Sequence, residues 1–296
     1  MDSPPPKAIA PRPDVLSATL AWIEQHLHEP LSVQAIAIEA GLSPYHYSRL
    51  FTARMGRSVM AYVRGRRLLS SARRLVSEPD LRIIDLAFDS GFESQEAYTR
   101  AFKRIFGVAP ARFRQGHALT SIQGQYPMTT TDPTTTDVAL LPERVHRAAF
   151  TVAGYARRFD DANKAEIQAL WPKLVGALPF EGQVKSWDAY GVIWSADRTE
   201  GSFHYMAAVE IQPGGLPPAG MEQMTIPAAT YMVFRITLDG GPVHPQIKAA
   251  MARIWGELIP ASGATVIDGP DFELMTGEFS PNRPGAIVDF YVPVEQ

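Results

Sequence analysis

The sequence predicts a multidomain protein. An all-α N-terminal domain with two helix-turn-helix units precedes an α+β domain of two strand-helix-strand-strand halves. Three observations support this prediction. One pattern occurs twice within residues 31–114, residues 119–137 are rich in Thr and Pro, and short β-rich runs begin near residue 143. With 296 residues, 46% of them hydrophobic, the chain is long enough to form two separate cores.

The repeated pattern is that of two helices joined by a sharp turn. Its shared positions are Ala37, Gly41 and Ser43 in the first copy, and Ala87, Gly91 and Ser94 in the second. A small Ala lets two helices cross closely, the Gly permits the positive φ of the turn, and the Ser can cap the next helix. The pattern therefore predicts helix pairs over residues 32–55 and 82–106.

Other helices are predicted around these pairs. Apolar residues at helical spacing predict a leading helix over residues 14–28, which Pro30 ends. Residues 60–76 carry five Arg among apolar positions and predict a long helix that joins the pairs. Pro44 fits the first turn of a helix. Within the second helix of each pair we expect an apolar, buried stripe of Tyr47, Leu50, Phe51, Tyr98 and Phe102.

The net charge of −3 conceals an asymmetry between the two ends of the chain. Residues 1–118 hold 16 basic and 11 acidic side chains, whereas the remainder holds 12 and 20. Residues 49–114 alone hold 14 basic and 6 acidic side chains. A basic block on a repeated helical motif indicates a polyanionic partner, although an Arg-rich helix can also be a solvated surface.

The region after residue 143 alternates β-rich and helical runs. Strands are predicted at residues 148–153, 189–194, 205–211, 229–236 and 286–292. Helical runs at residues 161–177 and 244–259 each follow a strand, carry a Trp and stop at a Pro. This order, strand, helix and two strands, occurs about twice and predicts a duplicated α+β domain.

Residues 20–116 resemble the AraC/XylS family of transcription activators. The most specific stretch runs from Gly91 to Gly107 and is followed by Pro110 and Phe113. In that family each helix-turn-helix unit places a recognition helix in the major groove. The resemblance implies DNA contacts by Tyr45, His46, Ser48, Arg49, Gln95, Glu96, Thr99 and Arg100, with Lys103 and Arg104 at the far end of the second recognition helix. Arg can pair with guanine and Gln with adenine, whereas Glu96 either accepts from a cytosine amine or weakens the reading.

Residues 143–296 resemble the GyrI-like effector-binding domains that are attached to AraC-type and MerR-type regulators. The matching stretches are residues 190–192 with 203–210, residues 226–234 with 240–241, and Phe272-Glu273 with residues 289–293. The resemblance implies a groove between the halves that is walled by aromatic rings and holds a buried acid. Such a groove suits flat or cationic apolar compounds.

The ligand-binding residues implied by this resemblance are Tyr190, Trp194, Tyr205, Tyr231, Trp255, Glu273 and Asp289. The chain departs from the family at two places. Asp289 stands where Glu is usual, and Leu274-Met275 stands where many members have an aromatic residue. Both departures affect which class of ligand fits.

The predicted domains are a disordered tail (1–13), the DNA-binding domain (14–118), a linker (119–142) and the effector-binding domain (143–296). The predicted partners are double-stranded DNA, RNA polymerase and a small-molecule effector. We expect no membrane partner, no cofactor, no metal and no catalytic residue. The absence of cysteine excludes disulfides and Cys-type zinc sites. Residues 1–13 lack a basic-then-apolar signal pattern, so we expect a cytoplasmic location.

Two alternatives remain open for the C-terminal domain. Its acidic surplus permits a protein partner in place of a small ligand. Relatives of the implied family include hydrolases, and Glu273 with Tyr205 could supply a general base and its neighbour.

Overall fold

The computed structural model forms two compact units. It describes residues 15–115, 142–160, 163–184, 187–195, 202–277, 279–281 and 283–295. The first unit comprises the described residues of Met1–Leu31, Glu39–Gly41 and Val63–Met128, and the second those of Ser32–Ile38, Leu42–Tyr62 and Thr129–Gln296. Residues 32–38 and 42–62 therefore group with the described C-terminal residues. The predicted tail (1–13) and nearly all of the predicted linker (119–142) lie outside the described residues.

Seven helices occupy the described part of the N-terminal region. They are α1 (Val15–Gln25), α2 (Val33–Glu39), α3 (Pro44–Met55), α4 (Val59–Ser77), α5 (Ile83–Asp89), α6 (Gln95–Phe106) and α7 (Pro110–Arg114). The predicted helix pairs are α2–α3 and α5–α6, and α4 is the predicted long helix between them. The repeated sequence pattern thus yields two helix-turn-helix units in an all-α region, as predicted.

The turns and caps follow the repeated residues. Gly41 and Gly91 both have positive φ, +66° and +79°, which a residue with a Cβ rarely adopts. Ser43 Oγ accepts from the backbone N of His46 at 3.3 Å, and Ser94 Oγ accepts from that of Ala97 at 3.1 Å. These serines satisfy backbone donors that the first helical turn leaves free, so α3 and α6 begin at defined residues.

The second helix-turn-helix unit has its own apolar core. Tyr98 and Phe102 of α6 are fully buried, as predicted, and pack with Leu86 of α5, Leu75 of α4 and Phe113 of α7. The Tyr98 hydroxyl lies 3.0 Å from Ser71 Oγ, so its polar end is also paired. This core fixes the direction in which α6 presents its outer face.

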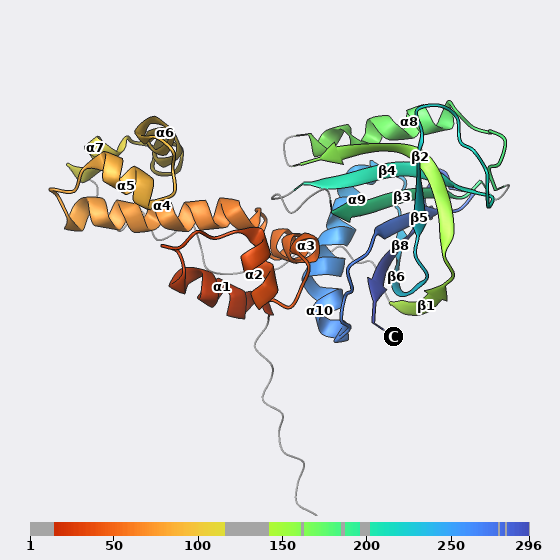
Figure 1. The fold of residues 1–296 in the computed structure, drawn as a ribbon, viewed down its shortest axis with the longest axis horizontal. Coiled ribbons are helices and arrows are strands. Elements are labelled where there is room, and N and C mark those ends of the chain that lie inside the picture. The colour runs from red at the N-terminus through yellow and green to blue at the C-terminus, as the bar shows by residue number, and fades with distance from the viewer. Residues whose placement is uncertain are drawn as a thin grey trace, which may run out of the picture. The chain divides into compact units, whose positions relative to one another are not determined.

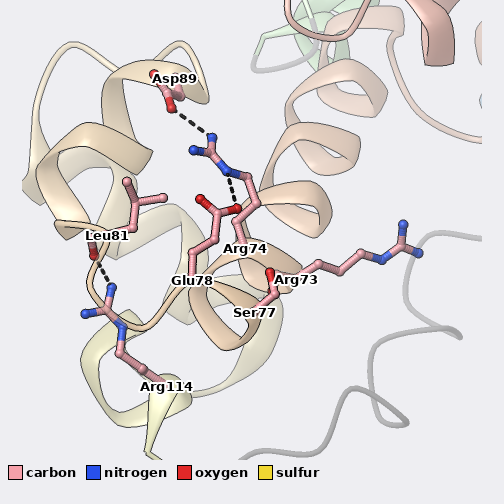
Figure 2. Close-up of polar contacts among 7 residues, drawn as sticks. All are labelled: Arg73, Arg74, Ser77, Glu78, Leu81, Asp89 and Arg114. Atoms are coloured by element: carbon pink, nitrogen blue, oxygen red, sulfur yellow. Dashed lines mark hydrogen bonds and ion pairs between the residues drawn. The ribbon is translucent and has the colours of Figure 1, made fainter.

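Polar contacts tie the end of α4 to the second helix-turn-helix unit (Figure 2). Arg74 forms ion pairs with Glu78 at 3.2 Å and with Asp89 at 2.8 Å, and these hydrogen bonds raise the pKa of its guanidinium. Arg114 donates to the carbonyl oxygen of Leu81. Arg73 points away from this cluster and is exposed. Part of the basic block therefore holds the fold together, and only part faces solvent.

The C-terminal region contains one antiparallel sheet of eight strands in the order β1-β6-β8-β7-β3-β4-β2-β5. The strands are β1 (Glu143–Arg147), β2 (Phe150–Phe159), β3 (Ala189–Ser195), β4 (Phe203–Ile211), β5 (Glu222–Ile226), β6 (Ala229–Thr237), β7 (Asp271–Met275) and β8 (Ile287–Val294). The helices are α8 (Leu170–Val175), α9 (Val243–Arg253) and α10 (Ile259–Ser262), with a 3₁₀ turn at Lys164–Ala169 and a π-helical turn at Ile254–Leu258.

The predicted duplication is present in this sheet. One half is β2-α8-β3-β4 and the other is β6-α9-β7-β8 (Figure 1). In each half the first strand pairs with the last, and the last pairs with the middle strand. The two middle strands, β3 and β7, join the halves, and Gly191 faces Glu273 at the centre of their five paired positions.

Side chains alternate between the two faces of the sheet. One face carries Ile193, Tyr205 and Phe234 and packs against Leu174 of α8 and Trp255 of the π-helical turn. The other face carries a second cluster, which includes Tyr190, Met206, Tyr231 and Phe272. Both faces are therefore apolar, which explains why the strands read as continuous apolar runs in the sequence.

Phe102→Ala is expected to destabilise the second helix-turn-helix unit by about 3–5 kcal/mol, because it removes a fully buried ring and leaves a cavity. Hydrogen exchange of the amides in α6 measures this loss. The control is Lys103→Ala, on the neighbouring exposed position, which should change the same free energy by less than about 0.5 kcal/mol. Equal protection in Phe102→Ala and the wild type would contradict the assignment of this core.

Candidate functional sites

A cavity of about 1050 Å³ lies within the second compact unit, on the helix-covered face of the sheet. Its walls are mainly apolar and aromatic. Tyr205 of β4, Trp171 of α8, Trp255 of the π-helical turn and Tyr45 of α3 all line it. Trp171 and Tyr205 meet edge to face, with ring centroids 6.3 Å apart. Cavities of this size and lining are typical of small-molecule sites.

Glu273 brings a carboxyl group into this apolar wall. The Tyr205 hydroxyl donates to Glu273 Oε2 at 2.8 Å. Burial raises the pKa of Glu273, while the Tyr205 hydrogen bond and the positive charge of Arg49 oppose this rise. Burial, reinforced by the neighbouring Glu273 charge, raises the pKa of Tyr205 well above its usual value. The ionised carboxylate of Glu273 is therefore incompletely hydrated in this pair.

Gly191 makes room for this pair. A Cβ at position 191 would lie 2.3 Å from the Tyr205 hydroxyl and 2.5 Å from Glu273 Oε2, far inside contact distance. A glycine inside a strand often marks a close approach of other groups. Gly191 is thus a site residue that the sequence analysis noted only as part of a family motif.

Trp255 has an unused hydrogen-bond donor. Its indole Nε1 is buried and has no hydrogen-bond partner among the described residues. The residue lies on a π-helical turn, a local widening of the helix that is frequent at functional sites. A ligand that accepts a hydrogen bond in the cavity could pair with this group.

The structure places three of the seven ligand-binding candidates in the cavity wall, namely Tyr205, Trp255 and Glu273. The other four, Tyr190, Trp194, Tyr231 and Asp289, lie at alternate strand positions and point to the opposite face. Asp289 there accepts both a 2.9 Å and a 3.0 Å hydrogen bond from Arg235. Tyr190 donates to Glu210 at 3.1 Å, and the Tyr231 hydroxyl donates to the carbonyl of Pro227 at 3.1 Å.

Trp194 on that opposite face stacks on His204, with ring centroids 5.0 Å apart.

Two residues near the cavity were not predicted from the sequence. Trp171 was noted only as a helix marker, and Asp271 was not considered at all. Asp271 is fully buried on the first residue of β7, two positions before Glu273 and therefore on the same face.

The second recognition helix, α6, presents most of its predicted DNA contacts to solvent. Gln95, Glu96 and Arg100 are exposed, Thr99 is half-buried, and Lys103 and Arg104 are exposed at the far end. These side chains lie where the predicted base-edge and phosphate contacts require exposure.

The first recognition helix, α3, is placed differently. Tyr45 and His46 are buried, and Ser48 and Arg49 are half-buried. Tyr45, Ser48 and Arg49 line the cavity, and Ser48 Oγ also donates to the carbonyl of Pro44 at 2.8 Å. The predicted DNA contacts of α3 are thus turned towards the C-terminal sheet and its helices within the second compact unit.

In the part of the chain that the structure describes, no three His, Asp or Glu side chains gather in a way that could hold a metal ion. None of the described helices has the length and apolar character needed to cross a membrane.

Comparison with known proteins finds a family match in each of two stretches of the chain. Residues 36–116 match the helix-turn-helix domain family, and residues 145–294, about half of the chain, match the family of integron-associated effector binding proteins. The chain therefore belongs to the integron-associated effector binding protein family, and it carries an AraC-type helix-turn-helix domain ahead of this GyrI-like domain.

Several curated proteins are similar to the N-terminal region. The uncharacterized HTH-type transcriptional regulator YbfP of Bacillus subtilis is 44% identical over 96 residues, 32% of each chain. The right origin-binding protein of Escherichia coli K12 is 41% identical over 103 residues, 34% of this chain and 35% of that protein. The multiple antibiotic resistance protein MarA of the same organism is 36% identical over 110 residues, 37% of this chain and 83% of MarA. The match thus spans about a third of the length of the first two relatives.

Among solved structures, the structure of SAV2435 bound to tetraphenylphosphonium is similar to this chain. The match covers 52% of this chain and 94% of the SAV2435 chain, at 19% sequence identity and a TM-score of 0.43.

Glu273→Gln is expected to stabilise the protein at neutral pH but not in acid. A carboxyl group with a raised folded-state pKa favours folding below its unfolded pKa, near 4.5, and this contribution is lost as the pH rises through the folded value. The amide keeps the shape and cannot ionise. Denaturant unfolding of both proteins below pH 4.5 and at neutral pH tests this. A stability difference that stays constant with pH would mean that Glu273 is not desolvated.

Proposed function

We propose that this chain is a transcriptional regulator that binds double-stranded DNA through its two helix-turn-helix units and binds a hydrophobic, positively charged small molecule in the cavity. The observation that carries the ligand part is the Glu273 carboxyl group, which sits in a cavity wall of aromatic rings and is hydrogen-bonded only by Tyr205 among the described residues.

The cavity chemistry favours a cation over a neutral compound. An ionised carboxylate in an apolar wall has lost much of its hydration, and a positive charge restores that stabilisation. Aromatic faces, such as those of Trp171 and Trp255, attract a cation and bury its apolar groups. A neutral apolar compound gains only the burial of its apolar groups and adds no charge that stabilises the carboxylate.

The DNA part of the proposal is supported by α6. Its capped N-terminus and its exposed Gln95 and Arg100 suit base edges, and its exposed Lys103 and Arg104 suit phosphates. RNA polymerase is the protein partner that we propose for a regulator of this type.

A hydrolytic role is the second candidate, because the structure brings Glu273 and Tyr205 into hydrogen-bond contact. The carboxylate would then act as a general base on water. Turnover of a panel of activated esters, abolished by Glu273→Gln, would support this role. Binding of a cation without turnover of any ester would favour the regulatory role.

Glu273→Gln is expected to lower the affinity for a lipophilic cation by about tenfold or more, equivalent to at least about 1.4 kcal/mol. Tetraphenylphosphonium is a suitable probe, because it surrounds one positive charge with four aromatic rings. Calorimetry on the full chain measures its binding, with neutral triphenylphosphine oxide as the comparison ligand.

The matched control is Asp289→Asn, because Asp289 is also a strand acid but pairs with Arg235 on the opposite face. This variant should bind the cation as the wild type does. Equal cation affinity in the wild type and Glu273→Gln, or an equal loss for the cation and the neutral compound, would refute the role of the Glu273 charge.

Gln95→Ala should cost about 1–3 kcal/mol at one base pair of the preferred site, because it removes a side chain that can read a base edge. Lys103→Ala should weaken binding to all sequences similarly and reduce the salt dependence by about one unit. Anisotropy titrations with a selected duplex and a scrambled duplex, each over a range of salt, distinguish these effects. An identical loss on both duplexes for Gln95→Ala would exclude base reading by this residue.

A further inference from the structure

Helix α3 uses its predicted base-reading face for contacts inside the second compact unit. Tyr45 is 7% exposed and His46 is 1% exposed, whereas their counterparts in α6, Gln95 and Glu96, are exposed. A residue that reads a base edge must be accessible in the major groove. The predicted base-reading residues are therefore buried at the start of α3 and exposed at the start of α6.

The contacts of Tyr45 and His46 are polar and specific. The Tyr45 hydroxyl donates to Asp271 Oδ2 at 3.0 Å, and His46 Nε2 lies 3.5 Å from Asp271 Oδ1. Asp271 is completely buried, so it needs compensation by such neighbours. The His46 ring also stacks on Trp255, with centroids 5.3 Å apart and planes 20° apart.

Arg49 places a positive charge against the aromatic wall. Its guanidinium carbon lies 5.6 Å from the Trp255 ring centroid and 5.9 Å from that of Tyr45, within cation–π range. It also contacts the sulfur of Met251 at 3.3 Å. Burial raises the pKa of Glu273, and the positive charge of Arg49 partly opposes this rise, so the two groups interact electrostatically. Arg49 thus occupies the kind of position that a cationic ligand would take.

The C-terminal end of α3 is also held. Arg54 donates to the carbonyl of Gly256 in the π-helical turn at 2.7 Å, and Ala53 packs against the apolar core. The contacts thus extend along α3 from its first turn to its last, over Tyr45, Arg49 and Arg54.

We propose that the cavity face of the effector-binding fold is an intramolecular docking site for α3, and that a hydrophobic cation entering the cavity competes with Arg49 and releases α3 to bind DNA. This inference rests on the proposed function, because it assigns a regulation to the same cavity. Docking and base reading exclude each other, since both use Tyr45, His46 and Arg49.

The competition follows from like charges. A cation placed near Trp255 and Glu273 meets the Arg49 guanidinium, and the aromatic face and the carboxylate can stabilise only one of them fully. A ligand that binds the undocked state more tightly shifts the population towards it by that difference in affinity. The apparent DNA affinity rises in proportion to the undocked fraction.

An engineered disulfide can trap the docked helix. The chain has no cysteine of its own, so only the introduced pair can form it. A Cβ at Gly256 would lie 3.7 Å from the Ala53 Cβ, which is within the range for a disulfide. Ala53→Cys combined with Gly256→Cys should therefore crosslink on oxidation in the full chain. The oxidised protein should lose more than about tenfold in affinity for a selected duplex, and reduction should restore it. The two single-cysteine variants are the controls and should not respond to oxidant.

The ligand is tested in the same variant. Tetraphenylphosphonium should slow formation of the crosslink, whereas triphenylphosphine oxide should slow it less. Failure to crosslink, or unchanged DNA affinity after crosslinking, would overturn the docking. A cation that binds in calorimetry but leaves the crosslinking rate unchanged would overturn the competition. Failure of the cation to bind at all would refute the proposed ligand class, and the crosslink would still report on docking.

A second variant is independent of the cysteines. Asp271→Ala removes the acid that holds Tyr45 and His46 but does not line the cavity, so it should raise DNA affinity without cation. It should also strengthen cation binding, because an undocked Arg49 no longer competes with the cation. Asp289→Ala, which breaks the Arg235 pair on the opposite face, is its control and should leave DNA affinity unchanged. Equal DNA affinity in Asp271→Ala and the wild type, with both proteins folded by circular dichroism, would contradict the docking.

Discussion

The absence of a side chain at Gly191 is the constraint on which the cavity depends. Strands β3 and β7 join the two halves of the sheet, and Gly191 faces Glu273 at the middle of that junction. Any side chain there would collide with both members of the Tyr205–Glu273 hydrogen bond. The vacant volume lets the tyrosine hydroxyl reach the carboxyl group, and this pair supplies the cavity with its one ionisable acid among the described lining residues.

The helical region could be predicted from the sequence almost completely, because its signals are local. A small residue, a glycine with positive φ and a serine cap each act within a few residues, so the repeated positions from Ala37 to Ser43 and from Ala87 to Ser94 define both turns. The buried state of Tyr98 and Phe102 also follows from helical spacing. The placement of α3 could not be predicted in this way, because it depends on Asp271 and Trp255, more than 200 residues away in sequence.

The sheet was predicted less completely, for three physical reasons. Strands β1, β5 and β7 were not predicted. The edge strands β1 and β5 are mostly exposed and polar, so they lack the apolar alternation that reveals a strand. Strand β7 is short and carries two acids. The central strands are apolar on both faces, so alternation does not show which aromatic residues face the cavity. Tyr190 and Tyr205 look equivalent in sequence, yet only the Tyr205 side chain points to the cavity face of the sheet. Glu273 lies opposite Gly191 in the register of the two middle strands. Because Glu273 faces the cavity, every second residue counted from these two positions lies on the cavity face.

The duplicated fold contributes two similar halves to the cavity wall, beside residues of α3, but the middle strands contribute unequal residues. At the facing central positions one strand offers a carboxyl group and the other offers no side chain. The shell is thus nearly two-fold in architecture, whereas its one carboxyl group among the described lining residues lies on one middle strand. An elongated compound with positive charge at one end has a single favourable direction in such a shell, so the domain would distinguish the two ends of its ligand even though its walls are alike.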